Sequence, residues 1–60
     1  MQLSNEDNVR VHDRESPYFG RSGWIASIRT VNGMRVYDVW LSRGLVLASF
    51  HHNQLKRLPS

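Results

Sequence analysis

The fold is decided by residues 20–41, which read GRSGWIASIRTVNGMRVYDVWL. This run is rich in β-branched and aromatic residues, and Asn32-Gly33 interrupts it in the middle. Asn-Gly is the strongest short hairpin signal, because both residues tolerate the positive φ angles of a type I′ turn. The segment therefore predicts a β-hairpin with strands at 23–31 and 34–41.

Alternation along the hairpin predicts which side chains face the core. One face of the second strand carries Tyr37, Val39 and Leu41, and the other face carries Val36, Asp38 and Trp40. In the first strand, Ile25 and Ile28 are three residues apart instead of two, which indicates a β-bulge or a sharp bend between them. Gly23 is expected where the chain turns tightly into this strand or approaches another backbone closely.

Outside the hairpin, periodicity and β-branched residues predict three more strands, at 8–12, 45–50 and 55–58. The connections are a long loop at 13–22, a turn at 42–44 and a single 3₁₀ turn at 51–54. No window shows helical spacing. We therefore expect an all-β fold, a small five-stranded SH3-like barrel with a one-turn 3₁₀ helix before the last strand. Residues 1–7 are assigned to a flexible N-terminal lead and 8–60 to the barrel.

Composition excludes several classes of function. The chain has 60 residues and no cysteine, so neither a disulfide nor a thiolate metal site can stabilise it. Three histidines are too few for a structural zinc site, which takes four protein ligands. The longest apolar run, 44–50, is far shorter than the roughly 20 residues of a membrane span. We expect a soluble cytoplasmic protein with no membrane insertion, no metal and no cofactor.

Catalysis has little support in the sequence. Ser49, Asp38 and His51 or His52 contain the residue types of a hydrolase triad, but no nucleophile turn or oxyanion site accompanies them. A chain of this length also leaves little room for a catalytic pocket. We predict a non-catalytic binding module with no small-molecule substrate, and a small barrel enzyme is the weaker alternative.

Charge is distributed unevenly along the chain. Counting side chains, residues 1–15 carry a net charge of −2 and residues 16–60 carry +5. Seven of the eight cationic residues are arginine, whose planar group matches phosphate and carboxylate and stacks on aromatic rings. An acidic partner is one explanation. The other is a solvated exterior, with cross-strand pairing of Arg29 or Arg35 with Asp38.

The predicted binding surface centres on the loop 14–22, because long loops often carry function. Trp24 precedes the inward-facing Ile25, so alternation turns its ring to the outside. Phe19 and one of the two tryptophans are expected in the core. The predicted contact residues are Arg14, Tyr18, Arg21 and Trp24, with Arg29, Arg35 and Arg43 as outer cations.

Residues 9–58 resemble the SH3-like barrels that include the KOW motif. The resemblance rests on Val9-Arg10-Val11, on Gly20 and Gly23 before Ile25 and Ile28, on Tyr37-x-Val39, and on Leu55. KOW domains of ribosomal proteins and transcription elongation factors bind RNA or RNA polymerase. The resemblance implies an RNA or protein contact within the transcription or translation machinery, and RNA before DNA.

A second resemblance is to the PsaE-type subunit of photosystem I. It rests on Val9-Arg10-Val11, Glu15-Ser16-x-Tyr18-Phe19 and Gly23-x-Ile25-Ala26-Ser27-Ile28. The second half departs from that family, because residues 43–50 replace a longer segment rich in asparagine and tyrosine. This resemblance implies a peripheral accessory subunit of a photosynthetic electron-transfer complex.

Two classes of partner therefore stay open for a module that docks into a larger complex. A nucleic-acid binder needs its arginines clustered on one face with an exposed aromatic ring among them. A protein-docking subunit needs an apolar surface patch instead, formed by residues such as Trp24, Trp40 or Leu47.

Overall fold

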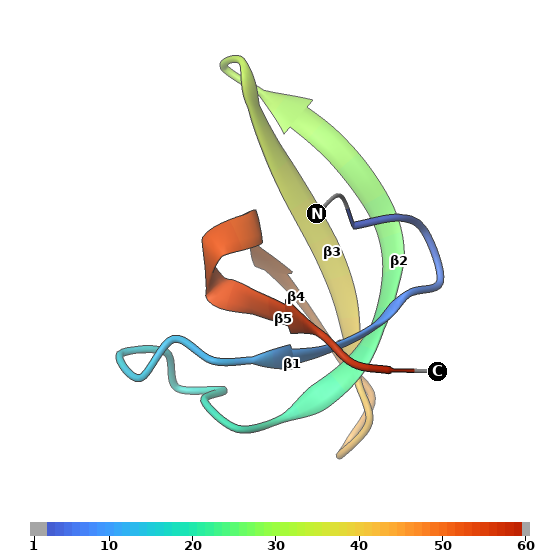
Figure 1. Ribbon diagram of the computed structural model, residues 1–60, viewed down its shortest axis with the longest axis vertical. Coiled ribbons are helices and arrows are strands. Elements are labelled where there is room, and N and C mark those ends of the chain that lie inside the picture. The colour runs from blue at the N-terminus through green and yellow to red at the C-terminus, as the bar shows by residue number, and fades with distance from the viewer. Residues whose placement is uncertain (1–2, 60) are drawn as a thin grey trace.

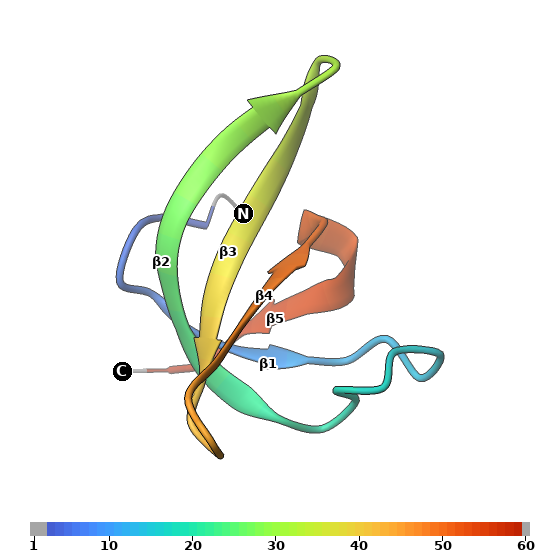
Figure 2. The ribbon, with the colours of Figure 1, turned by 180° about the vertical axis from the view of Figure 1, so that it is seen from behind.

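The computed structural model describes residues 3–59, which form five strands and one 3₁₀ turn (Figure 1). These are β1 (Asn8–Val11), β2 (Ser22–Val31), β3 (Met34–Leu41), β4 (Val46–Phe50), η1 (His52–Gln54) and β5 (Leu55–Arg57). All neighbouring strands are antiparallel, in the order β4-β3-β2-β1-β5. The sheet is strongly curved but open, with β4 and β5 as its edges (Figures 1 and 2).

The predicted strands and the 3₁₀ turn are confirmed, with small differences at their ends. β1 and β5 each end one residue before the predicted end, at Val11 and Arg57, and β2 begins one residue earlier than predicted. The prediction that β4 starts at Leu45 is wrong, because Leu45 has a φ of 49° and belongs to a four-residue turn. Its left-handed backbone cannot continue an extended strand.

The β2–β3 hairpin has the predicted two-residue turn. Asn32 and Gly33 have φ angles of 51° and 79°, and Val31 pairs with Met34 across the turn. The predicted bulge is also present, because the register of the pairing shifts between Ile25 and Ser27. Figure 1 shows this hairpin reaching the opposite end of the molecule from the turn between β3 and β4.

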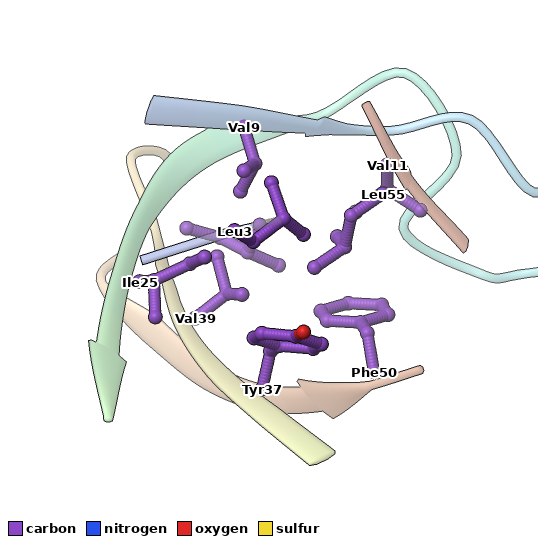
Figure 3. Close-up of a cluster of buried hydrophobic side chains, with 9 residues drawn as sticks. Leu3, Val9, Val11, Ile25, Tyr37, Val39, Phe50 and Leu55 are labelled. Carbon is purple, nitrogen blue, oxygen red and sulfur yellow. The ribbon is translucent and has the colours of Figure 1, made fainter. Parts of the chain in front are cut away.

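The core lies on the inner side of the curved sheet and draws on all five strands (Figure 3). Its buried members are Leu3, Val9, Val11, Ile25, Tyr37, Val39, Leu41, Phe50 and Leu55. The predicted inward face of the second hairpin strand is therefore confirmed. The Tyr18 ring packs edge-to-face on Phe50, with 6.1 Å between centroids.

The expectation that Phe19 and one tryptophan belong to the core is wrong. Phe19 is 51% exposed, and neither tryptophan is among the buried core residues. The preceding residue, Tyr18, makes the core contact from this loop. Both tryptophans occupy outward positions of the sheet, as the pairing described below requires.

The N-terminal lead packs against the domain from Leu3 onward. The Leu3 side chain is only 7% exposed and lies within the core cluster (Figure 3). The backbone N–H of Glu6 donates to the Ile25 carbonyl at 2.8 Å, and the Ile25 N–H donates to the Asp7 carbonyl at 3.0 Å. Residues of the predicted N-terminal lead therefore contact the core and the bulged part of β2. Residues 1–2 and 60 lie outside the described residues.

Candidate functional site

An apolar row crosses the outer face of the sheet. Trp24 of β2 pairs with Trp40 of β3, and Trp40 pairs with Leu47 of β4, so the three side chains stand side by side on three strands. Trp24 is 38% exposed and Leu47 is 51% exposed, while Trp40 between them is partly buried. Two aromatic side chains and an aliphatic one thus occupy adjacent positions on this face, which we call the outer row.

The bulge in β2 creates the outer row. A two-residue turn at Asn32-Gly33 without a bulge would place Trp24 opposite Leu41, which is in the core. The register shift after Ile25 moves Trp24 opposite Trp40 instead. Residues opposite each other in an antiparallel pair share one face of the sheet, so the two indole rings become neighbours.

A polar cluster lies next to the outer row on the same face of the sheet. Asp38, which is 9% exposed, accepts hydrogen bonds from the hydroxyls of Ser27 and Ser49, both at 2.7 Å. The Arg29 guanidinium donates to both carboxylate oxygens of Asp38, at 2.8 and 2.9 Å. The Arg29 hydrogen bond, followed by the two serine hydrogen bonds, holds the pKa of the Asp38 carboxyl well below its usual range.

The roles of Arg29 and Ser49, which the sequence left open, are structural in this cluster. Arg29, predicted as an outer cation, is neutralised by Asp38, so the cross-strand pairing alternative describes it. The Ser49 hydroxyl donates directly to Asp38 with no histidine between them. In a Ser-His-Asp triad the histidine must stand between the two, so this serine is not arranged as a nucleophile.

A depression of about 340 Å³ lies between the end of the long loop and the turn that follows β3. It is lined by Phe19, Gly20, Arg21, Ser22, Ser42 and Arg43. The Arg21 guanidinium lies over the Tyr18 ring, 5.6 Å from its centroid, and its Nη2 donates to the Arg43 carbonyl. The Ser42 N–H and hydroxyl both donate to the Ser22 carbonyl, at 2.9 and 3.0 Å, which joins the two walls.

The predicted contact residues therefore fall into several groups. Tyr18, Arg21 and Arg43 come together at the depression, whereas Trp24 belongs to the outer row. Arg14 is exposed in the long loop. Arg35 lines a second depression, of about 360 Å³, with Met34, Tyr37, His51, His52 and Asn53.

The side chain of Gln54 holds the 3₁₀ turn through two hydrogen bonds. Its Oε1 accepts from the His51 N–H at 2.8 Å, and its Nε2 donates to Asp13 Oδ2 at 2.9 Å. The bond from Gln54 is the main reason why the pKa of Asp13 is lowered. Residues 3–59 contain no cluster of three or more histidine, aspartate or glutamate side chains that could hold a metal ion.

The sequence did not indicate that Ser22, Ser42 and Phe19 line one depression. Ser22 and Ser42 are common residues at the ends of strands, and only the pairing of β2 with the turn after β3 brings them together. Trp40 and Leu47 were named as members of an apolar patch but not as site residues. Their signal was present in the sequence as outward positions of adjacent strands.

The described residues contain no helix with the length and hydrophobicity needed to cross a membrane. No protein-family model matches this chain, and neither a curated protein nor a solved structure matches it.

Proposed function

We propose that this protein is a non-catalytic module that docks onto a protein partner through the outer row of Trp24, Trp40 and Leu47. The observation that carries the proposal is the placement of these apolar side chains side by side on the solvent face of three adjacent strands. Aromatic residues at the centre of an apolar patch supply much of the binding energy in protein interfaces. A partner that covers the row removes this surface from water.

The surroundings of the row favour protein over nucleic acid. Asn8, the β1 residue that pairs with Trp24, is uncharged, and Arg29 on this face is paired with Asp38. The remaining arginines are spread over β1, the long loop, the depression, the hairpin tip and β5. A phosphate backbone needs several cations aligned on one face.

An SH3-like barrel is the architecture that we propose for the complete fold. The strand order, the long loop between β1 and β2, and the 3₁₀ turn before β5 support this proposal. The KOW-like resemblance is compatible with it, since such modules work within larger assemblies. A PsaE-like accessory subunit, docked at the periphery of a photosynthetic electron-transfer complex, would use the same kind of protein contact.

Substitution of the outer row is expected to abolish docking. Trp24→Thr and Leu47→Thr remove apolar contact area and keep a residue type that suits a strand. The matched control is Met34→Thr, because Met34 is 56% exposed, like Leu47, but lies at the hairpin tip. We expect capture of proteins from nuclease-treated native lysate, quantified by mass spectrometry, to fall at least about tenfold in Trp24→Thr and to stay unchanged in the control.

Two results would contradict docking through the outer row. One is capture that falls equally in Trp24→Thr and Met34→Thr. The other is the absence of any protein that the wild type retains and the Trp24→Thr variant loses. Circular dichroism of each variant establishes that it is folded before capture is compared.

Nucleic-acid binding is the second candidate function, favoured by the exposed Phe19 ring beside Arg21 and Arg43 in the depression. If it is the function, affinity for single-stranded RNA falls steeply with salt, and removal of one phosphate-contacting arginine reduces the salt slope by about one. Titration of RNA at two ionic strengths checks this. With protein docking as the function, we expect no RNA binding even at low salt.

A further inference from the structure

We infer that the depression between the long loop and the β3–β4 turn is a carboxylate-binding subsite, in which Arg21 and Arg43 receive an acidic side chain of the docked protein. The inference rests on the proposed docking function and names the chemistry of the partner. It requires a protein segment that carries an acidic side chain close to the apolar side chains that cover the outer row.

The first argument is that the two arginines of the depression lack counter-charges. Among the described residues, ion pairs join Arg29 to Asp38 and Arg57 to Asp7, and none involves Arg21 or Arg43. The lining residues include two arginines and two serines but no aspartate or glutamate. An anion that enters the depression therefore meets positive charge without competition from an acidic side chain of the lining.

The second argument is that Arg21 is held in place before any ligand arrives. Its guanidinium lies over the Tyr18 ring, and its Nη2 donates to the Arg43 carbonyl. Its Nε is buried and has no hydrogen-bond partner in the described part of the chain. A guanidinium fixed by stacking loses less side-chain freedom when it binds, so the subsite is preorganised.

The third argument is continuity with the outer row. Ser22 precedes Trp24 by two residues in β2, and Ser42 follows Trp40 by two residues. Two residues of extended chain cover about 7 Å. A partner in extended conformation can therefore place an apolar side chain on the row and, two residues away, a carboxylate in the depression.

A carboxylate fits this arrangement better than a phosphate backbone. The depression supplies one anion subsite beside an apolar surface, whereas a nucleic acid presents a phosphate at every nucleotide. Arginine binds a carboxylate through two parallel hydrogen bonds, which gives direction as well as charge. Ser22 and Ser42 add neutral polar residues to the lining.

The test uses NMR titration of the full chain with two blocked peptides. The first is acetyl-leucyl-seryl-glutamate amide, and its uncharged match is acetyl-leucyl-seryl-glutamine amide. We expect the first peptide to shift the Nε–Hε signals of Arg21 and Arg43 saturably, with about tenfold higher affinity than the second. Arg43→Gln should remove this preference, and the control Arg14→Gln should keep it.

Equal affinity for the two peptides would overturn the inference, and so would a uniform shift of all arginine signals. Tighter binding of inorganic phosphate than of the glutamate peptide would overturn the assignment to carboxylate. The proposed function can fail separately. If Arg21 and Arg43 respond to the peptide but Trp24→Thr retains every captured protein, the carboxylate subsite stands and docking through the outer row fails. If Trp24→Thr loses its proteins and the two arginines do not respond, only the inference fails.

Discussion

Replacement of Gly23 with alanine is expected to unfold most of the protein at room temperature. A Cβ atom at this position would lie 1.8 Å from the Trp40 carbonyl oxygen and 2.9 Å from the Leu41 Cα. Both are backbone atoms of the paired strand β3, so the clash is relieved only if the β2–β3 pairing breaks. We expect a loss of about 4 kcal/mol or more, which is comparable with the whole stability of a chain of this length.

Gly33→Ala is the matched control for this variant. Gly33 has a φ of 79° and open space around the added Cβ, so alanine there meets only backbone strain. That strain costs about 1–2 kcal/mol. Urea unfolding followed by far-UV circular dichroism compares the two variants. Equal midpoints for Gly23→Ala and Gly33→Ala would show that the close approach of β2 and β3 at Gly23 is wrong.

The hairpin is the part of the fold that sequence predicts best, because its signals are local. Asn32-Gly33 specifies the turn through its positive φ angles, and alternation from there identifies Tyr37 and Val39 as core residues. The start of β4 was harder to predict. Nothing in its composition shows that Leu45 adopts a left-handed backbone to complete a four-residue turn.

The outer row shows why a local signal did not suffice for the candidate site. The spacing of Ile25 and Ile28 leaves open whether the strand contains a bulge or a sharp bend. The bulge places Trp24 opposite Trp40, whereas pairing without a bulge would place it opposite Leu41. The sequence therefore predicts that Trp24 faces outward, and the pairing of three strands is needed to join it to Trp40 and Leu47.

The prediction of which loop residues are buried was wrong for a different reason. Alternation does not apply in the segment before β2, so hydrophobicity alone favoured Phe19 for the core, whereas Tyr18 packs there and Phe19 is exposed. The arginines were treated as one group because they are chemically alike. Their separation into a neutralised pair at Arg29 and a depression at Arg21 and Arg43 depends on strand pairing and loop geometry.

Asp38→Asn is expected to cause the second-largest loss of stability. The Asp38 carboxylate receives hydrogen bonds from Arg29, Ser27 and Ser49 and is nearly buried. An amide has one oxygen fewer to accept them and leaves the guanidinium without its counter-charge. Hydrogen bonds that involve a charged group contribute about 1.5–3 kcal/mol, and we expect a loss in this range.

The Asp38 carboxylate also makes the stability of the protein depend on pH in the acidic range. Its pKa in the folded state lies below the value of about 3.9 for an unfolded aspartate. The stabilisation is therefore fully present above about pH 5. As the pH falls below this value, the unfolded chain binds the proton first, and stability decreases until the folded carboxyl is also protonated.

Unfolding in urea at pH 7, 5, 4 and 3 tests both effects in one series. The wild type should lose stability between pH 5 and pH 3, and Asp38→Asn should lose less, because the group that binds the proton is absent. Glu15→Gln is the matched control, since it removes one negative charge from an exposed loop side chain and should keep the wild-type dependence. An Asp38→Asn curve parallel to that of the wild type would mean that the Asp38 cluster does not stabilise the β2–β3–β4 sheet through its charge. The outer row beside the cluster would then depend on strand pairing alone.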